Sequence, residues 1–179
     1  NNKNLGYAGG NNLGIKKALK NGADYILILN NDTKVINSKF LVRLVNYIKK
    51  RKDVGVIGPM VKDSKNELQK TILYFPFIKN FLRAKLWPIN IDYSHSHKVE
   101  SLSGVCILIR RIVIEKIGTF DKNYFMYGEE TEWFYRVRKA GWTVQYLPTD
   151  YLYEKQKGRG SDYRHQALIL IRVNPIYTL

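Results

Sequence analysis

Short apolar runs and segments with helical spacing alternate along the chain. The continuous runs each have the length of a strand and stop at polar or turn-forming residues. They are Tyr25–Leu29, Val54–Ile57, Gly104–Ile109 and Val144–Leu147. Runs of this kind are typical of strands that are buried on both faces of a sheet.

Helical segments lie between these strands. Apolar residues repeat at helical spacing over Phe40–Ile48, and Asn37 or Ser38 is the expected N-cap of this helix. The other helices are expected at Asn11–Lys20, in a brief segment that stops at Gly118, and at Glu129–Ala140, which Gly141 terminates. Strands that alternate with helices predict an α/β domain with a mostly parallel or mixed sheet.

The pattern is weaker in two regions. Across Lys62–Val99 short apolar stretches are broken by prolines, and long irregular excursions of this kind in compact domains are often functional. Towards the end, Tyr151–Gly160 is polar, and the apolar segment Ala167–Val173 is expected to form a helix. We therefore expect one domain over residues 1–179, with a C-terminal loop and helix at 149–179.

The composition fits a globular chain with a strongly basic balance. Of 179 residues 45% are hydrophobic, and 30 Lys and Arg against 15 Asp and Glu give a net charge of +15. Such a charge attracts nucleic acid, nucleotide-sugars or anionic membrane surfaces. The single cysteine, Cys106, leaves no disulfide framework within the chain and favours a reducing compartment. No apolar run approaches the roughly 20 residues of a membrane-spanning helix, and the start carries neither Met nor a signal peptide.

Polar side chains follow the first expected strand. Asn30, Asn31 and Asp32 stand where that strand ends, and open α/β sheets bind ligands at such places. Mg²⁺ takes oxygen ligands, commonly one or two carboxylates together with substrate phosphates. Asp32 can supply such a carboxylate, with Asn30 two positions earlier on the same side of the extended chain. The same residue types also form ordinary turns, and that alternative stays open.

Three carboxylates, Glu129, Glu130 and Glu132, stand at the start of an expected helix. The helix dipole favours acidic residues there. Glu130 and Trp133 share one helical face, so a carboxylate and an aromatic ring are expected to face the same space. Aromatic faces pack on the apolar side of pyranose rings, and a carboxylate can accept the proton of an attacking hydroxyl. The segment therefore indicates either sugar chemistry or simple electrostatics at a helix start.

A glycine-rich stretch, Asn4–Asn12, runs into the first expected helix. Glycines let the backbone approach a phosphate or a ribose closely, and a helix start favours anions. The stretch lacks the G-x-G-x-x-G spacing and the Walker lysine, so it does not define a nucleotide site on its own.

The order and spacing of four segments resemble family-2 glycosyltransferases of the GT-A fold, especially their rhamnosyltransferase-like branch. The segments are Asn4–Asn12, Tyr25–Thr33, Ser103–Arg111 and Ile117–Trp142. They resemble, in turn, the stretch before the metal strand, the strand that ends in the D-x-D equivalent, the acceptor-side strand and the catalytic E-D segment. The resemblance implies a GT-A-like three-layer sandwich, with the metal and acceptor half at about residues 4–148.

The resemblance implies an inverting transfer from a nucleotide-sugar to a polysaccharide or lipid-linked glycan, assisted by Mg²⁺ or Mn²⁺. Asp32 would hold the metal ion. Glu130 would take the acceptor proton, and Glu129 would orient the acceptor or serve as the alternative base, with Arg136 holding these carboxylates. The expected donor-binding residues are Asn4, Gly6, Gly9, Asn12, Asn30 and Asp32, and the expected acceptor-binding residues are Gly104, Tyr127, Trp133 and Arg136.

The chain departs from the family pattern in three ways. The usual Asp of the E-D pair is Glu130, which is one methylene longer. The family often carries a His near the metal after the last strand, and Tyr151–Ser161 has none, which argues against metal ligands from this loop. The family's first nucleotide-binding strands have no counterpart before Asn4. We therefore expect an N-terminally truncated domain, inactive alone, with an exposed sheet edge through which copies of the chain assemble.

Two other functions stay open. A non-catalytic domain could bind nucleic acid through its charge, although the Lys and Arg residues are spread along the chain and Glu129–Glu132 would repel phosphate. An inactive glycosyltransferase remnant would keep only a scaffolding or acceptor-binding role. For the leading interpretation we expect a cytoplasmic domain, peripheral on the inner membrane face through its basic surface, with nucleotide-sugar and glycan partners and no nucleic acid.

Overall fold

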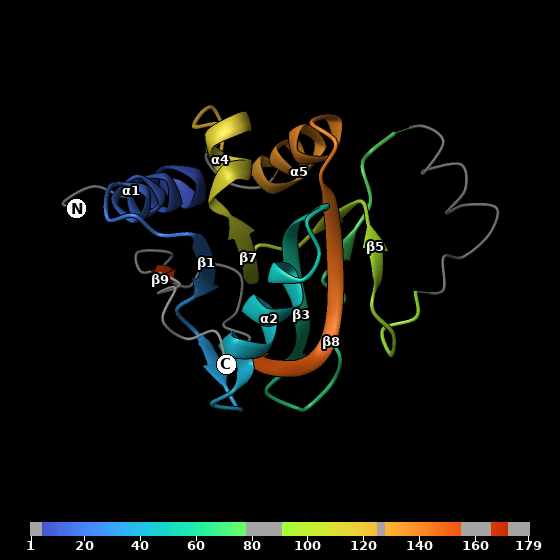
Figure 1. The fold of residues 1–179 in the computed structure, drawn as a ribbon. Coiled ribbons are helices and arrows are strands. Elements are labelled where there is room, and N and C mark those ends of the chain that lie inside the picture. The colour runs from blue at the N-terminus through green and yellow to red at the C-terminus, as the bar shows by residue number, and fades with distance from the viewer. Residues whose placement is uncertain (1–4, 78–90, 125–127, 155–165, 172–179) are drawn as a thin grey trace.

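A central mixed sheet organises the chain in the computed structural model, which describes residues 5–77, 91–124, 128–154 and 166–171 (Figure 1). Within these residues the main sheet has seven strands in the order β2-β8-β3-β7-β1-β9, with β5 paired to β8, and β4 and β6 form a separate pair. The strands are β1 (Tyr25–Asn30), β2 (Thr33–Val35), β3 (Val54–Asp63), β4 (Ile72–Leu73), β5 (His97–Val99), β6 (Ser101–Leu102), β7 (Cys106–Arg110), β8 (Thr143–Glu154) and β9 (Gln166–Ile171).

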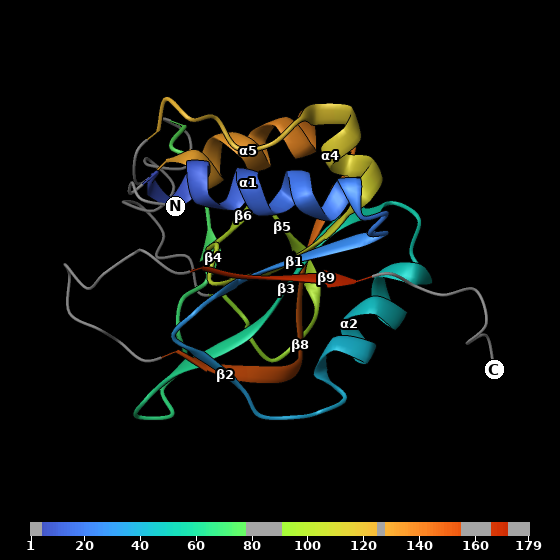
Figure 2. The same cartoon turned by 90° about the vertical axis from the view of Figure 1, so that its left-hand side faces the viewer.

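Helices cover both faces of this sheet. Figure 2 shows α1 (Gly6–Lys20), α4 (Arg111–Ile117) and α5 (Glu129–Lys139) on one face, and α2 (Phe40–Lys49) on the other. The burial of β1 explains the arrangement, because Ile26 and Ile28 belong to one apolar cluster while Leu27 and Leu29 belong to the other. The chain is therefore an α/β domain with three layers. No helix in the described ranges is long and apolar enough to span a membrane.

The expectation of a mostly parallel sheet is wrong. Among the described strands of the main sheet, β3 and β8 form the one parallel pair, and the other pairings are antiparallel. The stretch between β3 and β7 is built from short strands and loops in its described parts, and not from a single crossover helix. The β7 strand therefore enters the sheet antiparallel to both of its neighbours, β1 and β3.

The last apolar segment is a strand and not the expected helix. Gln166–Ile171 pairs antiparallel with β1, from Tyr25 opposite Ile171 to Asn30 opposite Gln166. A run of apolar residues too short for a stable isolated helix gains more from the backbone hydrogen bonds that a strand edge offers. Within the described residues β9 is therefore the outer strand on this side of the sheet. Assembly of copies through a sheet edge remains a prediction.

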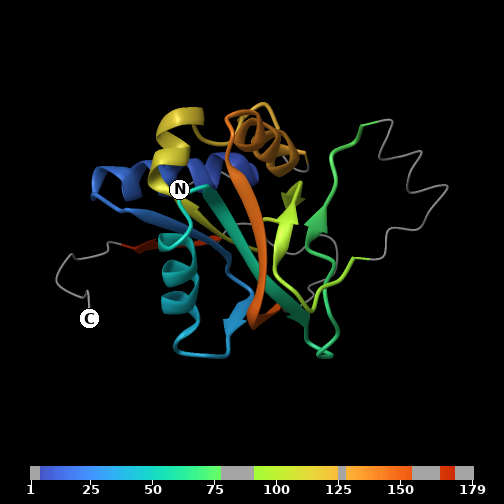
Figure 3. The same ribbon diagram turned by 45° about the vertical axis from the view of Figure 1, so that its right-hand side comes forward.

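Several elements extend beyond their expected ends. The helix α1 begins at Gly6, five residues before the expected Asn11, and α2 begins after Lys39 without a side-chain cap. Figure 3 shows the long strand β8, which pairs with β5 through its first part and with β2 through its last. The extension of β8 matters for function, because its register sets Glu154 opposite Thr33 of β2.

Candidate active site

Three elements, β1, β7 and α5, meet at one end of the sheet. The end of β1 is tied to the entry of β7, since the Asn30 N–H donates to the Val105 carbonyl over 2.9 Å. The next residue back, Gly104, donates its N–H to the Glu130 carboxylate at the start of α5. The strand-end polar cluster and the acidic helix start therefore lie at the same end of the sheet.

The Glu130 carboxylate is held from two sides. The Gly104 N–H donates to Glu130 Oε1 over 2.7 Å, and the Tyr7 hydroxyl in the first turn of α1 also hydrogen-bonds to this side chain. The Tyr7 hydroxyl lies 3.1 Å from the Gly104 carbonyl as well. Three segments far apart in the sequence thus fix one half-buried carboxylate. Tyr7 did not stand out in the sequence, because its position within Asn4–Asn12 suggests only a helix start.

Gly104 is required by this arrangement. A Cβ atom at this position would lie 1.8 Å from the Tyr7 hydroxyl and 2.1 Å from Glu130 Oε1, well inside van der Waals contact. Only glycine lets the backbone approach both groups closely enough to hydrogen-bond to them. The acceptor-side role expected for Gly104 remains a prediction, and its contribution to the site geometry is to position Glu130.

Burial and a neighbouring charge raise the pKa of Glu130. Removal of the carboxylate from water is the larger cause, the adjacent Glu129 adds like-charge repulsion, and together they raise the pKa to about 7. The hydrogen bonds from Gly104 and Tyr7 oppose this rise but do not cancel it. A carboxyl group with a pKa near neutrality is suited to accept a proton and to release it again.

Glu129 is the more deeply buried of the two glutamates. Its side chain is 3% exposed, and its Oε2 atom has no hydrogen-bond partner among the described residues. Burial raises the pKa of Glu129 as well. Gly128, the N-cap residue of α5, has a left-handed backbone with φ at +97° where the chain enters the helix. The preceding residue, Tyr127, lies outside the described residues.

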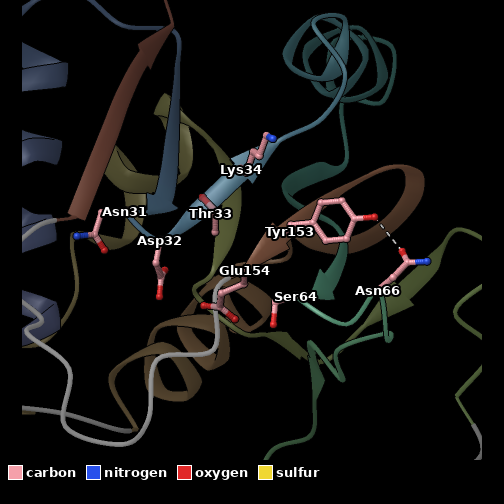
Figure 4. Close-up of a pocket in the computed structure, with 8 residues that line it drawn as sticks. All are labelled: Asn31, Asp32, Thr33, Lys34, Ser64, Asn66, Tyr153 and Glu154. Carbon is pink, nitrogen blue, oxygen red and sulfur yellow. Dashed lines mark hydrogen bonds between the residues drawn. The ribbon is translucent and has the colours of Figure 1, made fainter.

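The other part of the site is a cavity at the ends of β1, β2 and β8, shown in Figure 4. Its volume is about 490 Å³. The lining residues are Asn31, Asp32, Thr33, Lys34, Ser64, Asn66, Tyr153 and Glu154. In Figure 4 the carboxylates of Asp32 and Glu154 lie near each other, while Tyr153 points away from them towards Asn66, to which it hydrogen-bonds over 3.0 Å.

Glu154 is the residue of this cavity that sequence reasoning missed. The amide of Asn30 donates to Glu154 Oε1 over 3.0 Å, and burial, assisted by the nearby Asp32 charge, raises the pKa of Glu154. The absence of the family's His had argued against ligands from this loop. The available signal was the register of a β8 strand that runs on to Glu154, and the sequence predicted a strand only over Val144–Leu147.

The donor set at this cavity fits a hard divalent cation. Asp32 and Glu154 supply two carboxylates, and Mg²⁺ or Mn²⁺ commonly binds through one or two carboxylates and completes its shell with water and substrate phosphates. The residues that the structure describes contain no cluster of three or more His, Cys, Asp or Glu side chains suited to a metal ion. The fit is therefore to an ion shared with a phosphate ligand and not to a closed protein cage.

Two expected ligand contacts are corrected by the packing around α5. Trp133 is 1% exposed, donates to the Gly118 carbonyl over 3.0 Å and packs against Phe120, so the expected open aromatic platform is wrong. Helical spacing in the sequence predicts which face of α5 carries Trp133, but it does not predict how deeply the ring is buried. Arg136 does not hold Glu129 or Glu130. Its Nε and Nη2 atoms instead donate to the two oxygens of the Glu132 carboxylate, over 2.6 and 2.8 Å.

The expected donor-binding residues of α1 take positions inside the fold. Asn12 is 1% exposed, its amide donates to the Phe120 carbonyl over 2.7 Å, and its oxygen accepts from the Phe120 N–H over 3.0 Å. Gly6 adopts a left-handed backbone, with φ at +67°, at the start of α1, and Gly9 is buried. Asn4 lies outside the described residues. Donor binding by these residues remains a prediction. The two hydrogen bonds of Asn12 connect α1 to the loop before α5.

Comparison with known proteins finds a matching family and several similar proteins. Residues 2–166 match the family described as glycosyltransferase like family 2. An N-acetylglucosaminyl-diphospho-decaprenol L-rhamnosyltransferase of Mycobacterium tuberculosis is 31% identical over 123 residues, which are 60% of this chain and 40% of that protein. The low-salt glycan biosynthesis hexosyltransferase Agl10 of Haloferax volcanii is 30% identical over 138 residues, 76% of this chain and 44% of that protein.

A third relative and two solved structures extend the comparison. The dTDP-rhamnosyl transferase RfbF of Shigella flexneri is 27% identical and covers 82% of this chain and 47% of its own length. The chain thus spans less than half the length of these curated relatives. A crystal structure of GalNAc-T7 with UDP, GalNAc and Mn²⁺ superposes with a TM-score of 0.64 at 15% identity, over 89% of this chain and 32% of that one. A197 from STIV gives 0.51 at 15% identity, over 92% and 75%. At these identities the structures show the shared fold alone.

Proposed function

The chain belongs to glycosyltransferase-like family 2, and on that premise we propose that it transfers a sugar from a nucleotide-sugar to a hydroxyl of a glycan acceptor, with inversion. The observation that carries this proposal is the half-buried Glu130 carboxylate, with a pKa near 7, held at the same sheet end as the Asp32 cavity. Such a transfer needs a base and, at the same sheet end, a cavity whose carboxylates can hold a divalent cation for the diphosphate.

Glu130 acts as the base. As the bond forms between the acceptor oxygen and the anomeric carbon, the bond from that carbon to the diphosphate oxygen breaks, and the acceptor proton passes to the Glu130 carboxylate. Glu130 is preferred over Glu129 because Glu129 is only 3% exposed and has little access to an acceptor. Glu129 instead acts through its charge, which raises the pKa of Glu130 and makes it a stronger base near neutral pH.

Asp32 and Glu154 hold the donor side. Their carboxylates would bind Mg²⁺ or Mn²⁺, and that ion, when bound, supplies positive charge to the leaving diphosphate. Asn30 keeps the Glu154 carboxylate in place through its amide. Lys34, which also lines the cavity, adds positive charge from the protein itself on the donor side.

The relatives support one class of acceptor. They are an N-acetylglucosaminyl-diphospho-decaprenol L-rhamnosyltransferase, a low-salt glycan biosynthesis hexosyltransferase and a dTDP-rhamnosyl transferase. We propose a glycan acceptor of this class, lipid-linked or polymeric, and rhamnose or another hexose as the transferred sugar. Gly104 lies beside Glu130, where the acceptor hydroxyl must come, which supports its place on the acceptor side.

Release of nucleoside diphosphate tests the proposal. A panel of nucleotide-sugars is incubated with Mn²⁺ or Mg²⁺ and with lipid-linked or soluble glycan acceptors, using this chain and any longer protein that contains it. The proposal expects acceptor-dependent diphosphate release with at least one donor, and loss of that release in Asp32→Ala. Turnover that Asp32→Ala and Glu130→Gln leave untouched would contradict it.

A further inference from the structure

The segment from Lys34 to Lys52 is strongly basic. The 19 residues from Lys34 to Lys52 contain seven cations and no Asp or Glu, whereas the whole chain has 30 cations and 15 acids in 179 residues. The cations are Lys34, Lys39, Arg43, Lys49, Lys50, Arg51 and Lys52. We call the part of the chain from Lys34 to Lys52 the β2–α2 surface. Its density of cations is about twice that of the chain as a whole.

Aliphatic side chains are exposed on the same surface. Val35 is 38% exposed, Ile36 is 45% exposed and Val42 is 58% exposed. The apolar residues that α2 needs for packing face the other way, because Phe40 and Leu44 are almost completely buried against the sheet. The three exposed side chains are therefore not required by the core.

The β2–α2 surface lies next to the proposed donor cavity. Lys34 lines that cavity together with Asp32, and the chain runs from there through Val35 and Ile36 into α2. In Figure 2, α2 lies on the face opposite α1, α4 and α5, and the loop that leads into it runs along the bottom of the view. A flat partner could approach this face without meeting the helices of the other face.

We propose that the β2–α2 surface docks on an anionic lipid membrane. Lysines attract acidic lipid headgroups, and aliphatic side chains among them can enter the interface between headgroups and acyl chains. Nucleic acid is less well matched, since single strands are bound on exposed aromatic faces and most contacts to duplexes come from cationic and polar groups. The proposal rests on the proposed function for its purpose, because membrane docking would bring the donor cavity close to the membrane that carries a lipid-linked acceptor.

Co-sedimentation with vesicles tests the docking. Phosphatidylcholine vesicles with and without phosphatidylglycerol are compared for the chain and for two sets of variants. The triple variant Lys39→Gln, Lys49→Gln, Lys50→Gln should bind the anionic vesicles at least about tenfold more weakly, because each lysine near an anionic surface contributes several-fold. The double variant Ile36→Ser, Val42→Gln should also bind more weakly at unchanged net charge.

Matched controls come from the opposite face. The triple variant Lys16→Gln, Lys17→Gln, Lys20→Gln removes three exposed lysines of α1, and Leu13→Gln with Ile112→Gln removes two aliphatic side chains that are 47% and 54% exposed. Both controls should keep vesicle binding. Equal losses in test and control variants, or binding to a short RNA or DNA in place of vesicles, would overturn the proposal.

Vesicle binding can be tested independently of the proposed catalytic reaction. Glu130→Gln should bind anionic vesicles as the unchanged chain does, because Glu130 lies on the other side of the sheet from α2. Vesicle binding without transferase activity would leave the docking surface standing and refute the proposed reaction, while activity on soluble acceptors without vesicle binding would do the reverse.

Discussion

The backbone N–H of Gly104 donates a 2.7 Å hydrogen bond to the carboxylate of Glu130, across 26 residues of sequence. This bond joins the entry of β7 to the first turn of α5, and the Tyr7 hydroxyl closes the arrangement from α1. The proposed base is therefore held by the backbone of one element and by a side chain of another. Changes at each of these three residues should affect the reaction in different ways.

Substitution of Gly104 should displace the base without unfolding the domain. In Gly104→Ala the new Cβ would lie 2.1 Å from Glu130 Oε1, so the Glu130 side chain must move. A displacement of about 1 Å at a reacting group can lower the rate by about 100-fold, and we expect a loss of that order in steady-state transfer. Gly10→Ala is the control, because a Cβ there meets nothing within 4 Å, and it should keep full activity. Full activity of Gly104→Ala would refute the positioning role.

The pH dependence of the reaction should report the pKa of Glu130. The base must be ionised, so kcat/KM should rise with pH through about 7. Glu129→Gln removes a charge that raises this pKa, and the acidic limb should move to lower pH. Tyr7→Phe removes a hydrogen bond that lowers it, and the limb should move to higher pH. Shifts of both variants in the same direction would show that the limb belongs to another group.

The free energy of unfolding should also depend on the ionisation of Glu130. For catalysis the ionised form is needed, whereas for stability the protonated form is favoured. The pKa of Glu130 in the fold is raised from 4.5 to about 7, so the fold favours the protonated form, and ionisation costs stability as the pH rises through this range. Glu130→Gln resembles the protonated form and can still accept from Gly104. Its advantage in free energy of unfolding should grow between about pH 4.5 and pH 7 and reach about 1–3 kcal/mol, because each tenfold change in proton affinity corresponds to about 1.4 kcal/mol. Denaturant titrations at several pH values measure it, and a pH-independent difference would contradict the assigned pKa.

The sequence predicted those parts of the fold that depend on local pattern. The strand at Tyr25–Leu29 and the helix from Glu129 are confirmed almost to the residue. The continuous apolar run of the strand and the glycine that ends the helix are both visible in the sequence itself. The directions of the strands were not predictable in this way. They depend on pairings between segments far apart in the chain, and Ala167–Val173 shows no sign in its own sequence that its partner is β1.

The site was predictable to a similar extent. Glu130 and Asp32 follow from their motifs, although their chemical roles remain predictions. Glu154 and Tyr7 were missed because each acquires its place through a contact with a distant segment, Glu154 with Asn30 and Tyr7 with Gly104. Trp133 shows the reverse error, since helical spacing gave its face correctly and could not tell that Phe120 would cover the ring.

The two carboxylates of the cavity should act together on a metal ion. Asp32→Ala and Glu154→Ala should each weaken Mn²⁺ binding in the presence of a nucleoside diphosphate by about 10–100-fold, because each removes one oxygen ligand from a shell that has few protein ligands. Calorimetry or the electron paramagnetic resonance of free Mn²⁺ measures the affinity. Ser64→Ala, which lines the same cavity without a charge, is the control and should leave it unchanged. Equal Mn²⁺ affinity in all three variants would show that the metal ion does not bind in this cavity.

The central claim is that Glu130 takes the acceptor proton while Asp32 and Glu154 serve the donor. A single-turnover measurement with saturating donor, Mn²⁺ and acceptor tests it most directly, because it separates the chemical step from binding. For Glu130→Gln the account predicts unchanged donor affinity and a transfer rate lower by about 10²–10⁴-fold, the usual contribution of a general base. A transfer rate within about threefold of the unchanged chain, where the loss of a general base costs at least about 100-fold, would contradict the claim.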